Sequence, residues 1–254
     1  MRRLWIKVKF LYHWVMKNKH EISGVYETLR SFNGVFVFLP EHQARMQRSC
    51  EKLGFDYPNL AEIVAEFADF ESGGDVRLRV EVMRDGGFEV QHFDLPRWHG
   101  SFLYDEIWSV KIFEGARENP GLKSTDTVMQ AAAREAAEEE GCKEVILVDG
   151  QGRMTEGGIT NVWFVEGAGE EARLVTPASG MLPGIARGLI LQACEELGVE
   201  VAARDVLASE LDNFEGVFLS NSIRGLIATE DGDLPEVILR VAQWCTREIL
   251  RRRA

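Results

Sequence analysis

Apolar and polar residues follow two periods along the chain, one typical of strands and one typical of helices. Residues 76–82 alternate apolar and polar side chains, which predicts a strand with one buried face. Residues 236–251 fit an amphipathic helix, and residues 185–197 predict a helix that ends at Gly198. Because both periods occur in one chain, we expect mixed α and β structure.

Shorter runs and turn residues predict the remaining elements. Asn33-Gly34 and Asp85-Gly86-Gly87 suit the tight turns of two hairpins, the first of which spans residues 25–38. Further strands are expected at residues 4–10, 107–113, 144–148, 161–165, 172–176, 215–219 and 226–229. Further helices are expected at residues 40–53, at residues 58–70, and from a cap at Ser124 or Asp126 to Gly141.

The order of these elements predicts an α/β (α+β) protein of two domains. Asn119-Pro120-Gly121 is a turn-forming run between two groups of elements, and we expect the boundary there. The prediction is a smaller N-terminal α+β domain over residues 1–119 and a larger C-terminal domain over residues 120–254.

Charge and composition narrow the classes of partner. The 254 residues include 41 acidic and 29 basic side chains, a formal net charge of −12, and 45% are hydrophobic, enough for a sizeable core. A net negative field repels phosphate backbones and anionic lipids, which argues against nucleic acid and membrane surfaces as partners. No apolar stretch approaches the roughly 20 residues that cross a bilayer. A small anionic ligand remains compatible with this charge, because local basic groups decide its binding.

The cysteines and histidines do not predict a metal site. The four cysteines lie far apart without a Cys-x-x-Cys pair, which argues against zinc and against a dense disulfide framework. Reduced thiols fit a cytoplasmic protein. Lys7, Lys9 and His13 interrupt the first apolar patch, so we expect it to belong to the mature chain and not to a signal peptide. The five histidines show no ligand spacing.

Four short motifs carry the chemistry, and each is weakly specific alone. In chain order they are His42-Gln-Ala-Arg45-Met46, Gly121-Leu-Lys123-Ser124, Thr155-Glu156-Gly-Gly-Ile-Thr-Asn161 and Leu182-Pro-Gly184-Ile185-Ala186-Arg187. Together with residues 24–34 they resemble the fold-type IV pyridoxal-phosphate enzymes. That family includes branched-chain and D-amino acid aminotransferases and aminodeoxychorismate lyase. The resemblance extends over about residues 24–229, and the order and spacing of the motifs make it specific.

The resemblance implies a role for two of the motif residues. Lys123 would carry pyridoxal 5′-phosphate and act as general base and acid at the substrate α-carbon. Glu156 matches the carboxylate that keeps the pyridine nitrogen protonated, which lets the ring accept electrons. Without the other motifs, Lys123 would be read as a solvated lysine and Glu156 as a turn residue. Asn161 matches a family asparagine that we expect to support its strand.

The resemblance also implies a cofactor wedged between the two domains and a cradle for its phosphate. Arg45 matches the family's phosphate arginine, the backbone amides of Ile185 and Ala186 open a helix, and Ser222 occupies a matching hydroxyl position. Arg187 also matches the family, although an ordinary salt bridge fits it equally.

Substrate groups and oligomeric state are implied in the same way. Tyr26 matches a tyrosine that faces the substrate in D-amino acid aminotransferases. Arg84 and His92 lie where such enzymes bind substrate carboxylates, and solvated surface residues fit that region as well. Because relatives are usually dimers, we expect a homodimer that acts on small amino acids and keto acids.

Departures from the family pattern bear on the reaction. Val128 stands where branched-chain aminotransferases have a tyrosine, which argues against branched-chain specificity. Trp163 replaces a phenylalanine or tyrosine, and Ala186 replaces a threonine. Residues 219–225 resemble a run found in aminodeoxychorismate lyases. We expect an aminotransferase acting between an amino acid and a 2-keto acid. The alternatives are a lyase that releases pyruvate and 4-aminobenzoate, and a cofactor-binding relative without turnover.

Overall fold

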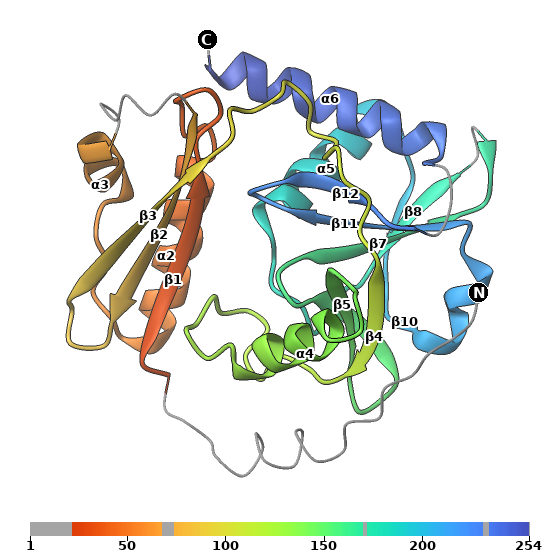
Figure 1. Ribbon diagram of the computed structural model, residues 1–254, viewed down its shortest axis with the longest axis horizontal. Helices are drawn as coiled ribbons and strands as arrows, with labels where there is room; N and C mark the ends of the chain where they lie inside the picture. The colour runs from red at the N-terminus through yellow and green to blue at the C-terminus, as the bar shows by residue number, and fades with distance from the viewer. Residues whose placement is uncertain (1–21, 68–73, 170–171, 231–233, 254) are drawn as a thin grey trace. The chain divides into compact units, whose positions relative to one another are not determined.

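The computed structural model describes residues 22–67, 74–169, 172–230 and 234–253, arranged as two compact units (Figure 1). The small unit contains the described residues within 20–101, 121–126 and 246–254. The large unit contains the described residues within 102–120 and 127–245. The strand expected at residues 4–10 lies outside the described residues.

The division between the units differs from the expected boundary at residues 119–120. Residues 102–120 belong to the large unit because β4 lies beside β5, and because Leu103 bridges to β12 and Trp108 to Thr229, the residue after β12. Residues 121–126 belong to the small unit because they run beside β1, where Ser124 bridges to Val25. Pairing between strands far apart in sequence therefore sets the division.

Helices and strands are mixed, which confirms the α+β class. The elements in chain order are β1 Gly24–Arg30, α2 Leu39–Leu53, α3 Leu60–Phe67, β2 Asp75–Met83, β3 Phe88–Leu95, β4 Val110–Glu114, α4 Val128–Glu138, β5 Glu144–Val148, β6 Arg153–Gly157, β7 Asn161–Glu166, β8 Arg173–Thr176, α5 Ile185–Leu197, β9 Val201–Ala203, β10 Val206–Leu207, the 3-10 helix η2 Ala208–Asn213, β11 Gly216–Asn221, β12 Gly225–Ala228 and α6 Glu236–Arg253.

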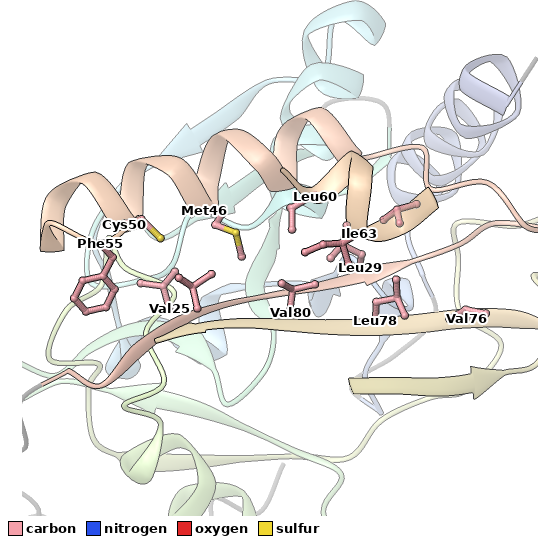
Figure 2. Close-up of a cluster of buried hydrophobic side chains, with 12 residues drawn as sticks. Val25, Leu29, Met46, Cys50, Phe55, Leu60, Ile63, Val76, Leu78 and Val80 are labelled. Atoms are coloured by element: carbon pink, nitrogen blue, oxygen red, sulfur yellow. The ribbon is translucent and has the colours of Figure 1, made fainter. Parts of the chain in front are cut away.

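The small unit is a three-stranded antiparallel sheet, in the order β1-β2-β3, with helices on one face. Alternate side chains of β1 and β2 point to that face, as their alternating sequences predict. Met46 and Cys50 of α2 lie over Val25, Leu29 and Val80 of the sheet (Figure 2), and α3 adds three further apolar side chains to this core. This packing buries one face of the sheet and leaves Tyr26 on the other.

The hairpin expected over residues 25–38 is wrong beyond its turn. Asn33 and Gly34 have the predicted positive φ, 48° and 87°, but only Phe32 and Val35 pair across them. β1 instead pairs along its length with β2. The chain after Val35 turns into α2, whose second residue is proline, a residue that suits the first turn of a helix.

The large unit stacks two sheets and covers them with helices. One sheet has the order β10-β6-β5-β4, and the other β12-β11-β7-β8-β9. Ile146 and Val148 of β5 face the core between the sheets, whereas Val145 and Leu147 pack against α4. β5 is therefore buried on both faces, which explains the uninterrupted apolar run over its residues 145–148.

The helix boundaries show which caps the sequence predicted correctly. α2 and α5 fall within one residue of their expected bounds. Gly198, the predicted end of α5, has a φ of 67°, and Gly54, which was not predicted as a cap, ends α2 with a φ of 71°. The cap expected for α4 is wrong, since Thr127 stands at its N-cap and makes no side-chain hydrogen bond there. α3 ends at Phe67, and residues 68–70 of its expected span lie outside the described residues.

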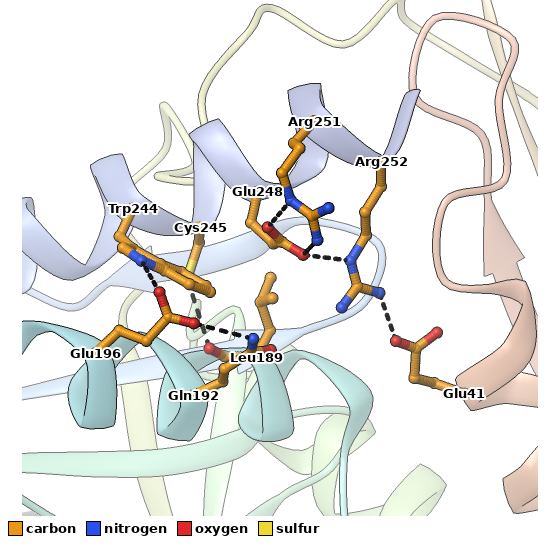
Figure 3. A network of polar contacts seen from close by, with 9 residues as sticks. All are labelled: Glu41, Leu189, Gln192, Glu196, Trp244, Cys245, Glu248, Arg251 and Arg252. Carbon is orange, nitrogen blue, oxygen red and sulfur yellow. Dashed lines mark hydrogen bonds and ion pairs between the residues drawn. The ribbon is translucent and has the colours of Figure 1, made fainter. Parts of the chain in front are cut away.

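The last helix, α6, has partners in each unit (Figure 3). In the large unit, Trp244 donates a hydrogen bond to Glu196 over 3.2 Å. In the small unit, Glu248 accepts hydrogen bonds from Arg251 and Arg252, and Arg252 also pairs with Glu41. The basic end of this helix is thus compensated by carboxylates of the chain itself.

Three further properties follow from the described residues. Among them, no helix is both long and apolar enough to cross a membrane. Nor do they contain a group of three or more histidine, cysteine, aspartate or glutamate side chains able to hold a metal ion. The four cysteines are free thiols.

Candidate active site

Lys123 is positioned by backbone pairing with β1. The amide of Tyr26 donates to the carbonyl of Lys123 over 2.9 Å, and the amide of Thr125 donates to the carbonyl of Gly24 over 2.9 Å. Residues 121–126 therefore extend the sheet of the small unit at its β1 edge. Lys123 sits on this added segment, five residues before α4 begins at Val128.

The ring of Tyr26 faces the amine of Lys123. The Lys123 Nζ lies 4.4 Å from the ring centroid of Tyr26, and the guanidinium of Arg79 lies 3.7 Å from the same centroid. The side chains of Tyr26 and Lys123 are half-buried, and Tyr26 points to the face of the sheet away from α2. The structure thus brings together the two residues that the sequence assigned to the cofactor amine and to the substrate.

Arg45 is held by a buried carboxylate. Its Nε and Nη2 donate to the two oxygens of Glu27, each over 2.7 Å, and His42 Nδ1 donates to Glu27 over 2.7 Å. Glu27 is fully buried and His42 is 2% exposed. One edge of the guanidinium is therefore fixed in a bidentate pair, which orients Arg45 rigidly.

The ionisation states of Glu27 and His42 depend on burial and on their neighbours. Burial alone would raise the pKa of Glu27, but the charge of Arg45 and the hydrogen bonds from Arg45 and His42 hold it well below its usual range. Burial lowers the pKa of His42 despite the neighbouring carboxylate, and Arg45 and Lys123 lower it further. His42 is therefore neutral at neutral pH. Since an ionised Glu27 only accepts hydrogen bonds, the proton of His42 resides on Nδ1.

The role of Glu27 was not predicted from the sequence. The signal was available, because Val25, Glu27 and Leu29 occupy alternate positions of β1 and share its buried face. A carboxylate on a buried face requires a partner, and Arg45 supplies it.

Arg84 and His92 are not brought to the Tyr26 face. Arg84 lies over the ring of Phe55, a core residue, at 5.8 Å. His92 pairs in register with Leu78, whose side chain is in the core, so both point to the helix-covered face of the sheet. Tyr26 points the opposite way.

In the large unit, Glu156 is buried between an arginine and a loop. Its Oε1 accepts a hydrogen bond from Arg117 Nε over 2.7 Å, and its Oε2 accepts one from the amide of Leu182 over 2.9 Å. The Leu182 carbonyl in turn accepts from Asn161 Nδ2 over 2.8 Å. Glu156 and Asn161 therefore hold the two peptide groups on either side of Leu182, so the Asn161 side chain supports the loop before α5 and not the strand that was expected.

The amides of Ile185 and Ala186 lie in the first turn of α5, where backbone N–H groups lack an intrahelical acceptor. Gly184 is the N-cap residue and no side chain caps the helix. A Cβ atom on Gly184 would lie 2.0 Å from Asn161 Oδ1, so glycine is required for this close approach. The uncapped helix start offers donors suited to an anion.

A pair of glycine replacements tests this packing. Gly184→Ala is expected to lower the free energy of unfolding by about 1–3 kcal/mol, because the added methyl group displaces Asn161. Gly188→Ala, on the same helix with nothing within 4 Å of the added atom, is the control and should stabilise the protein by about 0.5–1 kcal/mol. Urea denaturation measures both values. Equal effects from the two variants would contradict the close approach.

Glu144 holds the turn that follows Glu156. Its oxygens accept hydrogen bonds from the amides of Gly158 and Ile159 and from the hydroxyl of Thr160, each over 3.1 Å. Burial raises the pKa of Glu144, and these donors oppose that shift. No role was predicted for Glu144 from the sequence, although a glutamate that opens a wholly buried strand was the available signal.

The remaining predicted residues have simpler surroundings. Ser222 is half-buried in the turn between β11 and β12, where Asn221 Oδ1 accepts from the amides of Ile223 and Arg224. Arg187 donates to Thr176 Oγ1 and to the Pro177 carbonyl, at 3.3 and 3.2 Å, so these acceptors are uncharged. Trp163 stacks on Phe218, with 5.7 Å between ring centroids.

The donor set fits a phosphorylated pyridine. The large unit offers a buried carboxylate for a ring nitrogen and free helix amides for a phosphate. The small unit offers a half-buried lysine beside a tyrosine and a fixed arginine. Each unit, taken by itself, therefore carries groups of the kind that pyridoxal phosphate requires.

Sequence comparison identifies the family. The sequence pattern described as amino-transferase class IV matches residues 24–229, and the chain belongs to that family. A "probable branched-chain-amino-acid aminotransferase" of Thermotoga maritima is 28% identical over 81% of this chain and 76% of its own length. A D-alanine aminotransferase of Bacillus licheniformis is 27% identical over 81% and 77%. An aminodeoxychorismate lyase of Bacillus subtilis is 24% identical over 80% and 75%.

Solved structures share the fold. A hypothetical aminotransferase from Mycobacterium tuberculosis, in its PLP-bound form, has a TM-score of 0.73 at 19% identity and covers 90% of this chain and 89% of its own. A fold IV transaminase from Curtobacterium pusillum has a TM-score of 0.71 at 23% identity, with 90% and 85% covered. The fold-type IV architecture and pyridoxal phosphate as the cofactor are confirmed.

Proposed function

We propose that the protein is an aminotransferase that transfers an amino group between an amino acid and a 2-keto acid. The observation that carries the proposal is the environment of Glu156, which is 2% exposed and hydrogen-bonded to the loop before α5. A carboxylate buried beside free helix amides suits a ligand that combines a basic ring nitrogen with a phosphate. Family membership points to the same chemistry.

The residues divide the work of binding and proton transfer. Pyridoxal phosphate, when bound, supplies an electron sink for the charge that develops at the substrate α-carbon. Lys123 carries the cofactor, and its amine removes and returns the α-proton. Glu156 holds the ring nitrogen in its protonated form. The Tyr26 ring limits the positions open to the Lys123 amine and borders the substrate.

The phosphate would be bound by several donors. Arg45 supplies a charged donor whose direction Glu27 fixes. The amides of Ile185 and Ala186 supply neutral donors at the positive end of α5. Ser222 supplies a hydroxyl. Val128 is exposed at the start of α4 and has no hydroxyl to offer, which supports a specificity other than that of the branched-chain enzymes.

The run from residue 219 to residue 225 favours a second candidate, an aminodeoxychorismate lyase that releases pyruvate and 4-aminobenzoate. Asn221 closes this turn with two hydrogen bonds. Gly225 has a φ of 81°, and a Cβ there would lie 2.2 Å from the Phe102 carbonyl. The turn is therefore tightly specified, and the B. subtilis lyase is among the relatives. A cofactor-binding relative without turnover is the third candidate.

A substrate test separates these candidates. The purified protein with pyridoxal phosphate is incubated with L- or D-glutamate and pyruvate, and both amino acids and both keto acids are quantified. Matched consumption of donor and acceptor is expected for an aminotransferase. Release of pyruvate from aminodeoxychorismate without any transfer would establish the lyase. Cofactor binding without either reaction would leave the non-catalytic candidate.

We also propose that the protein is a cytoplasmic homodimer, because homodimers are expected from the family resemblance and reduced thiols fit that compartment. Sedimentation equilibrium would test the assembly, and a mass of one chain at all concentrations would contradict it.

A further inference from the structure

Arg117 is a buried cation beside Glu156. It follows the carboxyl end of β4, and its side chain is 7% exposed against 3% for that of Glu156. The contact is a hydrogen bond from Nε over 2.7 Å. An arginine buried to this degree requires a carboxylate partner, and Glu156 in turn would be a buried, uncompensated charge without it.

The hydrogen bonds of Glu156 continue from Arg117 into the loop before α5. The second oxygen of Glu156 binds the amide of Leu182, which stands only three residues before Ile185, the first residue of the helix. Asn161 holds the carbonyl of Leu182, so both polar groups of this residue's backbone are fixed. A change in the direction of Glu156 would therefore move the start of α5.

A second observation concerns another nitrogen of the Arg117 guanidinium. Its Nη1 is buried and has no hydrogen-bond partner among the described residues. Buried donors in native proteins are nearly always satisfied by the chain, by water or by a ligand. The guanidinium thus has one group engaged with Glu156 and one donor that the described chain does not satisfy.

We infer that Arg117 is a positioning residue that couples the two ends of the cofactor site. By fixing Glu156, it sets both the carboxylate that faces the pyridine nitrogen and the loop that presents the helix amides to the phosphate. This inference rests on the proposed function, in which Glu156 and the α5 amides bind the same cofactor. Coupling of this kind is reciprocal, so a phosphate bound at α5 would also favour the productive direction of Glu156.

The coupling is tested by ligands that probe the two ends separately. Inorganic phosphate probes the helix amides, and pyridoxal, which lacks the phosphate, probes the ring end. Dissociation constants are measured on the apoprotein by titration calorimetry for wild type, Arg117→Met and Arg117→Lys. Arg153→Met, on the same strand as Glu156 but paired with Asp149 and Asp205, is the matched control.

Arg117→Met is expected to weaken the binding of both probes by about fivefold or more, although the hydrogen bond of Arg117 is made to Glu156 and not to the helix amides. Arg117→Lys should restore part of the loss, because it keeps the charge and loses the fixed fork. Weaker binding of pyridoxal with unchanged binding of phosphate would overturn the coupling. Unchanged binding of both probes would overturn any positioning role.

Two further measurements keep the outcome clear. Thermal unfolding of each apoprotein shows whether the variant is folded, and if Arg117→Met is not, Arg117→Lys carries the same test. The proposed function is tested independently of the coupling. It would be contradicted if wild type gave no Lys123-dependent visible absorption band with pyridoxal phosphate. Loss of phosphate affinity in the Arg117 variants would still be measurable in that case.

Discussion

Lys123→Ala is expected to abolish the visible absorption band that pyridoxal phosphate gives with the protein and to reduce transamination by about 10⁴-fold. Alanine removes both the amine that carries the cofactor and the group that transfers the α-proton. The backbone of residue 123 would keep its place beside β1, because that pairing uses the carbonyl of Lys123 and not its side chain. Absorption spectra and initial rates measure the two effects.

Lys143→Ala is the control for this variant. Lys143 is half-exposed and pairs with Glu106 over 2.7 Å, so its loss should change neither the spectrum nor the rate. A band that persists in Lys123→Ala, or that is lost equally in both variants, would contradict the assignment of Lys123.

The second large effect is expected on stability. Glu27→Ala should lower the free energy of unfolding by about 3–5 kcal/mol, because it leaves Arg45 buried without its counter-charge. That is a large part of the stability of an ordinary domain, about 5–15 kcal/mol. Urea denaturation of the apoprotein at neutral pH measures the difference.

Removal of both charges is the control for this effect. The double variant Glu27→Met with Arg45→Met leaves no unpaired ion, and we expect it to recover much of the lost stability. His42 adds no charge, since burial lowers its pKa. A double variant no more stable than Glu27→Ala would show that the pair acts through shape and not through charge.

The same pair predicts a direction for the effect of pH. The pKa of Glu27 is lower in the folded protein than its ordinary value of 4.5. Its contribution to stability is therefore complete above that value and is lost as the pH falls below it. The double variant should lose less stability than wild type over that acidic range, as followed by urea denaturation at successive pH values.

Local sequence signals predicted most of the elements. Helices α2 and α5, and Gly198 at the end of α5, follow from residues that are neighbours in the chain. The turn at Asn33-Gly34 was also correct in its backbone conformation. Its assignment to a hairpin was wrong because the choice between β2 and residues 35–38 as a partner for β1 depends on the α2 core, which short runs do not reveal.

The residues of the candidate site also fall into those that short sequence motifs could predict and those that they could not. Motif order led to the assignment of Lys123, Tyr26, Glu156 and the α5 start as site residues, since each lies in a short family run. Arg117 and Glu144 lie outside the strongest runs, and their roles depend on contacts 39 and 16 residues away in sequence. Such contacts arise only when strands pair, so residue spacing alone could not assign them.

The discontinuous small unit constrains how this enzyme could be recombined with its relatives. Residues 22–101 supply Tyr26 and Arg45, but the segment 121–126 supplies Lys123, and residues 246–253 supply the partner of Glu41. A chimera joined at a single crossover near residue 101 or 120 would therefore separate Lys123 from the strand that positions it. We expect functional chimeras only when all three segments come from the same parent protein.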